Sequence, residues 1–161
     1  MIFEEILEQI NAHLSDTLVK SIDENASPKA IVIDKSSLDE LMIFLHKKDN
    51  LYFDSLSCLT GLDNGVEANT MEVIYNLYSI PYDHHLMVKV ILERTSPILP
   101  TVTSIWKTAD WQEREAYDML GIKFLGHPDL RRILMPADWD GYPLRKDHTD
   151  QEYYRGIKID Y

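Results

Sequence analysis

The chain has 161 residues, 45% of them hydrophobic, which is typical of one globular domain. A formal net charge of −11 at pH 7 argues against general nucleic-acid binding and against docking on anionic lipid through charge. No run approaches the roughly 20 uncharged apolar residues that cross a bilayer, and the acidic N-terminal region indicates no secretory signal. The single cysteine, Cys58, excludes an internal disulfide or a Cys-based metal site within this chain and favours a reducing compartment.

Two amphipathic helices are predicted in the first third of the chain. Apolar residues recur at helical spacing over 2–14, and three glutamates lie near the start, where the helix dipole favours anions. The second helix is predicted at about 37–48. There Ser37 and Glu40 have capping-box spacing, and two lysines lie at the C-terminal end.

Five strands are predicted, at about 18–22, 30–33, 51–60, 70–80 and 86–94. Apolar residues alternate along 70–80 and 86–94, and the short connection between these two strands predicts a hairpin. Cys58 falls within a strand and is expected to be a small core residue. The order of helix, two strands, helix and three strands predicts an α+β fold of two layers, with a mixed sheet and helices on one face.

Helical structure is predicted again after the sheet. A short helical segment is expected at about 101–106, and a longer helix spans about 110–120. Asp110 is the candidate N-cap of the longer helix, and Gly121 lies where a left-handed C-cap is expected.

The C-terminal part has a different composition. Residues 1–126 contain 10 Lys/Arg and 20 Asp/Glu, whereas residues 127–161 contain 6 and 7. After Phe124 no helical or strand period is sustained, yet the content of large apolar and aromatic residues is high for a disordered segment. The sequence therefore predicts a compact α+β domain over 1–125, including the helix at 110–120, and an extended partner-binding arm over 126–161.

The densest polar cluster lies in the predicted helix at 110–120. Helical spacing brings Arg114, Glu115 and Asp118 to one face together with Trp111. One hypothesis is a stand-alone hydrolase in which Glu115 and Asp118 act as acid and base and His127 shuttles protons. The cluster lacks a nucleophile beside a base, a phosphate loop and metal-ligand spacing, so an ion-pair network or a solvated face is the commoner meaning. The prediction is that no residue is catalytic, binds a cofactor or ligates a metal.

A longer pattern resembles a known family. It begins with Glu113-Arg114-Glu115-x-x-Asp118-Met119-Leu120 and continues through His127 to Arg131-Arg132-Ile133-Leu134-Met135-Pro136. It ends with Asp138-Trp139-x-Gly141-Tyr142-Pro143-Leu144-Arg145-Lys146-Asp147. The pattern, over about 113–147, resembles the C-subunit (thirty-kilodalton subunit) family of respiratory complex I, the proton-translocating NADH:quinone oxidoreductase. It departs from the family at His148, where an aromatic residue is common.

The resemblance implies a non-catalytic peripheral-arm subunit of a translocase. It implies that the complex uses FMN, iron–sulfur clusters, NADH and quinone, none of them bound by this chain. The implied partners are the D subunit above all, and the cluster-bearing B and I subunits. The implied location is the cytoplasmic side of the bacterial inner membrane, or the matrix or stroma equivalent, with only indirect membrane contact. The equivalent subunit of a related membrane-bound hydrogenase or ferredoxin-linked oxidoreductase is the alternative within the same superfamily.

The matched residues are expected to form the partner interface. Charged members are expected in helix-to-arm or inter-subunit ion pairs, and three large apolar members are expected to be anchors. The expected interface residues are Glu113, Arg114, Glu115, Asp118, His127, Arg131, Arg132, Trp139, Tyr142, Pro143, Leu144, Arg145 and Lys146, with Trp139, Tyr142 and Leu144 as the anchors.

Overall fold

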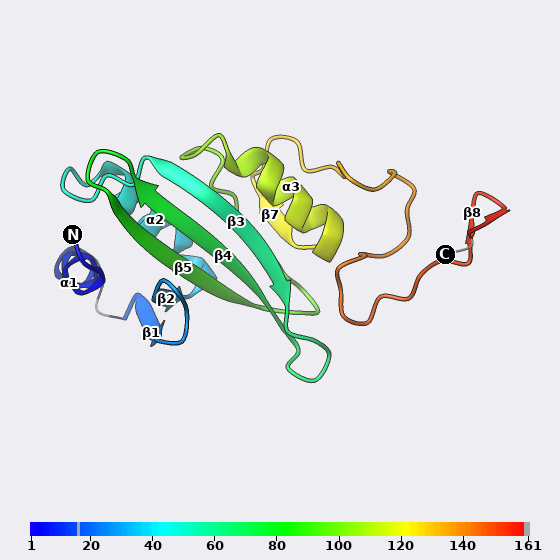
Figure 1. The fold of residues 1–161 in the computed structure, drawn as a ribbon, viewed down its shortest axis with the longest axis horizontal. Helices are drawn as coiled ribbons and strands as arrows, with labels where there is room; N and C mark the ends of the chain where they lie inside the picture. The colour runs from blue at the N-terminus through cyan, green and yellow to red at the C-terminus, as the bar shows by residue number, and fades with distance from the viewer. Residues whose placement is uncertain (16, 160–161) are drawn as a thin grey trace.

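The computed structural model describes residues 1–15 and 17–159 (Figure 1). The helices are α1 (Phe3–His13), the 3-10 turn η1 (Lys35–Ser37), α2 (Leu38–Lys47) and α3 (Ala109–Leu120). The strands are β1 (Val19–Asp23), β2 (Ala30–Ile33), β3 (Ser55–Asp63), β4 (Thr70–Ser79), β5 (His84–Glu93), β6 (Ile98–Pro100), β7 (Lys123–Leu125), β8 (Tyr153–Tyr154) and β9 (Ile157–Lys158).

Five strands form one mixed sheet in the order β1-β2-β5-β4-β3. The β2–β5 pair is parallel, and the other three pairs are antiparallel. The hairpin of β4 and β5 stays in register from Thr70 opposite Glu93 to Ser79 opposite His84. The predicted hairpin and the mixed character of the sheet are therefore confirmed.

One face of this sheet carries the core. Along β4, Met71, Val73, Tyr75 and Leu77 are buried while their neighbours are only half-buried, because alternate side chains point to opposite faces. Buried apolar residues of α1 and α2 belong to the same hydrophobic cluster, and Figure 1 shows α2 behind the sheet. These contacts confirm the predicted two-layer α+β fold with helices on one face.

Helix α3 packs beside β3 at Gly61 (Figure 1). A Cβ atom at Gly61 would lie only 2.6 Å from the Leu120 side chain, so the absence of a side chain permits this close approach. The helix ends at Gly121, whose φ of +77° confirms the predicted left-handed C-cap. Over the ranges described, no helix is both long enough and apolar enough to cross a membrane.

The predicted helix at 101–106 is wrong, because this segment is irregular apart from a turn at 103–105. The Glu113 carboxylate accepts the Val102 N–H at 2.8 Å, and the Trp106 indole N–H donates to the Phe53 carbonyl at 3.0 Å. Contacts with distant residues thus hold the segment in an irregular path. They outweigh its local helical preference.

Both predicted side-chain N-caps are also wrong. Ser37 has helical dihedral angles (φ −97°, ψ −1°) because η1 runs directly into α2, and its side chain makes no capping hydrogen bond. Helix α3 begins at Ala109, so Asp110 lies inside the first turn instead of preceding it.

The prediction that Cys58 is a core residue is wrong, because Cys58 is exposed. An irregularity in the β3–β4 register between Leu56 and Cys58 interrupts the alternation of side chains. Leu56 and Leu59 therefore face the core, and Cys58 does not.

We call residues 126–159 the arm. After β7, which pairs in parallel with β6, the arm runs outward from the sheet and ends in the β8–β9 hairpin (Figure 1). The two residues of the hairpin turn, Arg155 and Gly156, both have positive φ, which suits a tight two-residue turn. The division of the chain at residue 125 stays a prediction.

A candidate partner interface at helix α3 and the arm

Asp118 fastens the arm to helix α3. Its side chain is fully buried, and Oδ2 accepts the N–H groups of Ile133, Leu134 and Met135 at 2.9, 2.6 and 2.9 Å. Oδ1 accepts a hydrogen bond from Nη1 of Arg132 at 3.2 Å. A buried carboxylate is stable only when such donors satisfy it, so Asp118 and this stretch of the arm require each other.

Tyr142 is held between two arginines above the end of α3. The guanidinium carbons of Arg132 and Arg145 lie 5.2 and 4.8 Å from its ring centroid. Arg145 also donates from Nε to the Leu120 carbonyl at 2.7 Å, where the helix leaves carbonyls unpaired. A Cβ atom at Gly121 would lie 2.6 Å from the Tyr142 ring, so this glycine both ends the helix and makes room for the arm.

A third contact joins the arm to the far end of the sheet. The Asp63 carboxylate, at the end of β3, accepts hydrogen bonds from Nε and Nη2 of Arg94 at 2.8 and 3.0 Å. It also accepts a hydrogen bond from the Lys146 N–H at 2.8 Å. Arg94 also forms an ion pair with Asp147. The hydrogen bonds from Arg94 hold the pKa of Asp63 well below its usual range.

Sequence reasoning missed Asp63 and Arg94 as residues that position the arm. Asp63 lies outside the strands predicted from the sequence, and Arg94 is the last residue of the strand predicted at about 86–94. Their pairing joins residues 31 positions apart, which no local pattern reveals. The one usable signal was two opposite charges, Asp63 just after the strand predicted at about 51–60 and Arg94 at the end of the strand predicted at about 86–94.

Glu113 and His127 are buried inside the chain. Glu113 accepts the Thr101 hydroxyl at 2.5 Å and the Val102 N–H at 2.8 Å, and burial raises its pKa to about 7. His127 donates from Nε2 to the Asp110 carbonyl at 3.1 Å. His127 Nε2 lies 3.9 Å from the Glu113 carboxylate. Neither side chain is available to touch another protein directly, so any interface role is to position the segments around them.

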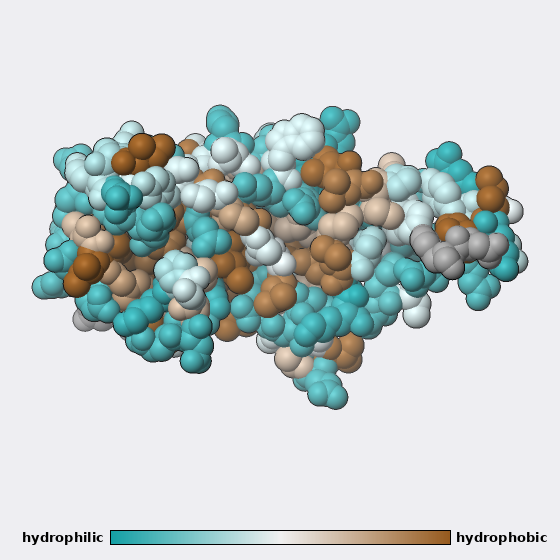
Figure 2. Space-filling model, in the orientation of Figure 1, coloured by the Kyte–Doolittle hydropathy of each residue, from teal (hydrophilic) through white to brown (hydrophobic). Residues whose placement is uncertain are grey.

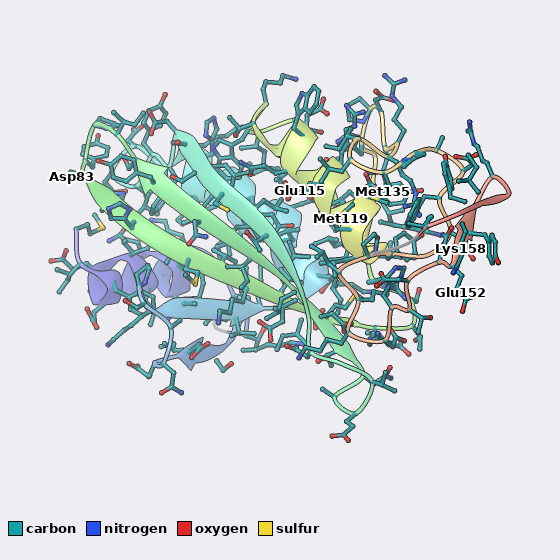
Figure 3. All side chains as sticks on the ribbon, turned by 45° about the vertical axis from the view of Figure 1, so that its right-hand side comes forward. Asp83, Glu115, Met119, Met135, Glu152 and Lys158 are labelled. Carbon is teal, nitrogen blue, oxygen red and sulfur yellow. The ribbon has the colours of Figure 1, made fainter. Side chains whose placement is uncertain are left out.

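Arg114 and Glu115 lie on different sides of α3. Arg114 donates from Nε to the Arg131 carbonyl at 3.3 Å and lies 3.9 Å from the Asp129 carboxylate, which makes a helix-to-arm ion pair. Glu115 is exposed and borders a hollow between α3 and β3 that also includes Cys58. Figure 3 labels Glu115 and Met119 on α3 and Met135 on the arm.

The remaining expected interface residues lie along the arm. The Leu144 N–H donates to the Met119 carbonyl at 3.0 Å, while 61% of Leu144 remains exposed. Pro143 is half-buried and Lys146 is exposed. Trp139 is half-buried, and its ring contacts Tyr154 at a centroid distance of 5.4 Å.

The residues of the hydrolase hypothesis are not brought into contact. Asp118 is occupied by the arm amides and Arg132, His127 faces Asp110 and Glu113, and Glu115 borders the hollow on the β3 side. In the part of the chain that the structure describes, no three His, Cys, Asp or Glu side chains are grouped as metal ligands. The arrangement fastens the arm to helix α3.

Comparison with known proteins identifies, along most of the chain, the same family that the pattern at 113–147 resembles. The family model described as "Respiratory-chain NADH dehydrogenase, 30 Kd subunit" matches residues 31–154. The NADH-quinone oxidoreductase C subunit of Chloroherpeton thalassium is 46% identical over 145 residues, which are 89% of this chain and 60% of that protein. The C subunit of Chlorobium phaeobacteroides is 43% identical over 89% of this chain and 87% of its own length. The C/D subunit of Acinetobacter baylyi is 41% identical over 73% of this chain and 21% of that protein.

Two solved structures share the fold. A trypsin-resistant fragment of Nqo5 is 32% identical with a TM-score of 0.65, and the match covers 81% of this chain and all of the fragment. A chain of the archaeal membrane-bound sulfane sulfur reductase has a TM-score of 0.74 over 91% of this chain and 85% of its own, at 21% identity, which shows a common fold alone. With the family match over residues 31–154, the chain belongs to the 30 Kd subunit family of respiratory-chain NADH dehydrogenase.

Proposed function

We propose that this chain is a scaffold subunit of a proton-translocating NADH:quinone oxidoreductase. It would hold the quinone module against the D subunit, so that electrons pass from NADH through FMN and iron–sulfur centres to quinone. The observation that carries the proposal is the family match, which runs through both the sheet and the arm. The chain spans only 60% of its Chloroherpeton relative, so the activity and partners of the whole complex belong to the proposal.

The D subunit is the partner that the comparisons favour. In the Acinetobacter relative the C and D names belong to one polypeptide, and a joined chain keeps its two parts at high effective concentration. Such fusions are compatible with two parts that work side by side. The B and I subunits are proposed as further neighbours on the strength of the resemblance.

The arm is the proposed contact surface. Figure 2 shows hydrophobic atoms exposed on the arm at the right of the view. Leu134, Leu144 and Ile157 are 60%, 61% and 72% exposed, although the backbone around the first two is hydrogen-bonded to the domain. Large apolar side chains held outward on an ordered segment suit a protein interface. Trp139 and Leu144 remain candidate anchors, whereas the Tyr142 ring already contacts Arg132 and Arg145 of this chain.

The proposed role needs no chemistry from this chain. The complex would bind FMN, iron–sulfur clusters, NADH and quinone in other subunits, and this chain would act through contacts. We propose a place on the cytoplasmic side of the bacterial inner membrane, or its matrix or stroma equivalent, reached through the other subunits. A free-standing enzyme is disfavoured because Glu115, Asp118 and His127 face different partners.

The test is a pull-down of the tagged full chain from detergent-solubilised membranes of cells that carry the complex. Wild-type chain should recover the D subunit together with the B and I subunits. A Leu144→Glu variant should recover at least tenfold less, because a charge would enter the apolar contact. Ile43→Glu on α2, a change at a side chain that is 44% exposed, is the matched control and should behave as wild type. A wild-type chain that recovers no D subunit contradicts the proposal.

The alternative assignment is the equivalent subunit of a related membrane-bound complex. The fold likeness to the sulfane sulfur reductase chain is the observation that keeps it in view. The pull-down separates the two, because recovery of an NADH-oxidising flavin module supports the first assignment and recovery of a nickel-ligating large subunit supports the hydrogenase.

A further inference from the structure

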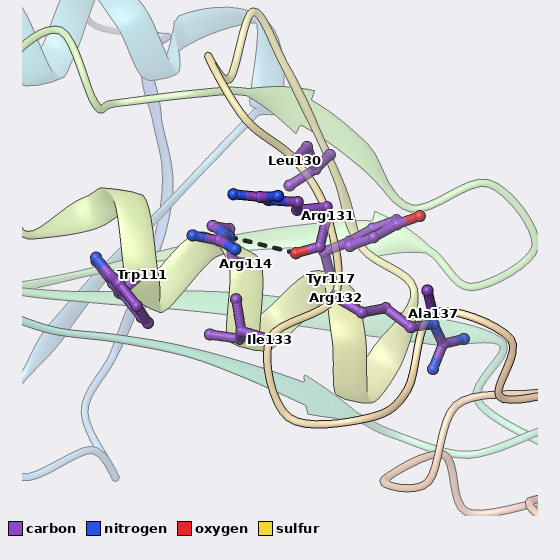
Figure 4. A pocket seen from close by; sticks show the side chains of 8 residues that line it. All are labelled: Trp111, Arg114, Tyr117, Leu130, Arg131, Arg132, Ile133 and Ala137. Atoms are coloured by element: carbon purple, nitrogen blue, oxygen red, sulfur yellow. Dashed lines mark hydrogen bonds between the residues drawn. The ribbon is translucent and has the colours of Figure 1, made fainter.

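A groove of about 610 Å³ lies between α3 and the arm (Figure 4). One wall carries Trp111, Arg114 and Tyr117 from the helix, and the other is formed by arm residues from Leu130 to Ile133 and by Ala137. In Figure 4 the guanidinium groups of Arg114 and Arg131 lie near each other, with the Trp111 ring beside Arg114. Arg132 belongs both to this groove and to the Tyr142 contact, whereas the groove includes none of the residues at Asp63.

The charge of the groove is opposite to that of the chain. Three arginines line it, whereas the chain as a whole carries a formal charge of −11. No carboxylate is among its lining residues. Asp118, which pairs with Arg132, is fully buried behind the groove wall. Asp129 pairs with Arg131 at 2.9 Å and with Arg114 at 3.9 Å, so the three arginines and these two carboxylates keep one net positive charge, which would attract a carboxylate.

Arg131 is the cation most easily used by a partner. Its side chain is 72% exposed, and its ion pair is with Asp129, whose side chain is 47% exposed. Only Nε takes part in that pair, at 2.9 Å, which leaves the outer fork of the guanidinium toward solvent. Exposed pairs of this kind contribute little to stability, so a partner carboxylate can compete for Arg131.

Trp111 supplies the apolar half of the groove. It is 66% exposed, which is unusual for the largest side chain in a folded protein. Arg114 Cζ lies 5.1 Å from the Trp111 ring centroid, and Arg114 Nε donates to the Arg131 carbonyl, so Arg114 links the ring to the arm backbone. Tryptophan and arginine are the residue types that dominate binding energy at protein interfaces.

We infer that this groove binds an acidic segment of a neighbouring protein subunit. The segment would place one Asp or Glu carboxylate on Arg131 and an adjacent apolar side chain against Trp111. An exposed indole beside the guanidinium favours a peptide over a free phosphate, since phosphate offers nothing to the ring. The inference rests on the proposed function, because the occupant is taken to be another subunit of the same complex.

The test follows Trp111 directly by fluorine NMR in the full chain. The chain contains three tryptophans, so 5-fluorotryptophan labelling gives few signals, and a Trp111→Phe variant assigns the one that matters. The probes are synthetic peptides that tile the acidic stretches of the D, B and I subunits from the same genome. Each peptide is paired with a version in which Asp and Glu are replaced by Asn and Gln, and inorganic phosphate is titrated separately.

At least one acidic peptide should shift the Trp111 signal saturably, with a Kd at least tenfold lower than that of its neutral version. Arg131→Glu should weaken that binding at least tenfold, whereas Lys35→Glu, the same charge change on an exposed residue of η1, should alter it less than twofold. The inference is overturned if no peptide shifts the Trp111 signal, if the neutral versions bind equally well, or if phosphate alone binds equally well. If wild type still recovers the D subunit in the pull-down, the proposed function survives that result.

Discussion

Replacement of Asp118 by asparagine tests whether one carboxylate holds the arm. Asparagine keeps the shape but removes the charge that three backbone N–H groups and Arg132 share. Hydrogen bonds to an ionised acceptor exceed neutral ones by about 1 kcal/mol each. Breaking a buried ion pair costs about 3–5 kcal/mol, and the partial exposure of Arg132 puts the expected loss in unfolding free energy near the lower limit, about 3 kcal/mol.

The assay combines urea unfolding of the full chain at pH 7 with hydrogen exchange. Asp118→Asn should lower the midpoint and accelerate exchange of the Ile133, Leu134 and Met135 amides. Glu115→Gln removes the same charge from an exposed position of the same helix and should change stability by less than about 0.5 kcal/mol. A loss below about 1 kcal/mol together with protected amides at 133–135 would refute the reasoning.

Three further outcomes are expected. Burial raises the folded-state pKa of Glu113 from 4.5 to about 7, so its favourable contribution to stability is complete below pH 4.5 and is lost as the pH rises through 7. The unfolding free energy of the wild type relative to Glu113→Gln should therefore fall by about 3 kcal/mol over this range. Urea midpoints of the two proteins that run parallel from pH 4.5 to 8 would contradict this. Gly121→Ala should lower the unfolding free energy by about 1–2 kcal/mol, because residue 121 has a left-handed backbone. The new Cβ should also displace the Tyr142 ring, which NMR spectra would show as a loss of the shielding that this ring gives its neighbours. A fragment of residues 1–125 should keep cooperative thermal unfolding but recover no D subunit, and a fragment without cooperative unfolding would show that the arm belongs to the domain core.

Much of the fold was predictable because its signals are local. Helix α2 and the hairpin of β4 and β5 follow from apolar periodicity, since each element buries one face in the same core. Two of the failures come from interactions across the chain. A register irregularity turned Cys58 outward, and contacts from Glu113 and Trp106 kept 101–106 out of a helix.

The candidate site was predictable as a segment but not as a set of contacts. The family pattern marked the helix and arm residues, yet it placed buried Glu113 and His127 on the same footing as exposed Arg131. It left out Trp111, although helical spacing put that residue on the face of Arg114. Burial depends on the path of the arm, which has no period from which a path could be read.

The arm is fastened at Leu134 and Leu144 through backbone groups, and the side chains of these two residues stay largely exposed. Asp118 and the Met119 carbonyl bind the arm through backbone N–H groups, including those of Leu134 and Leu144, which every residue except proline possesses. The side chains at these two positions could therefore change in size and shape while the arm kept its course. Substitutions at these two positions could therefore adapt the surface to a changed partner protein without destabilising the fold.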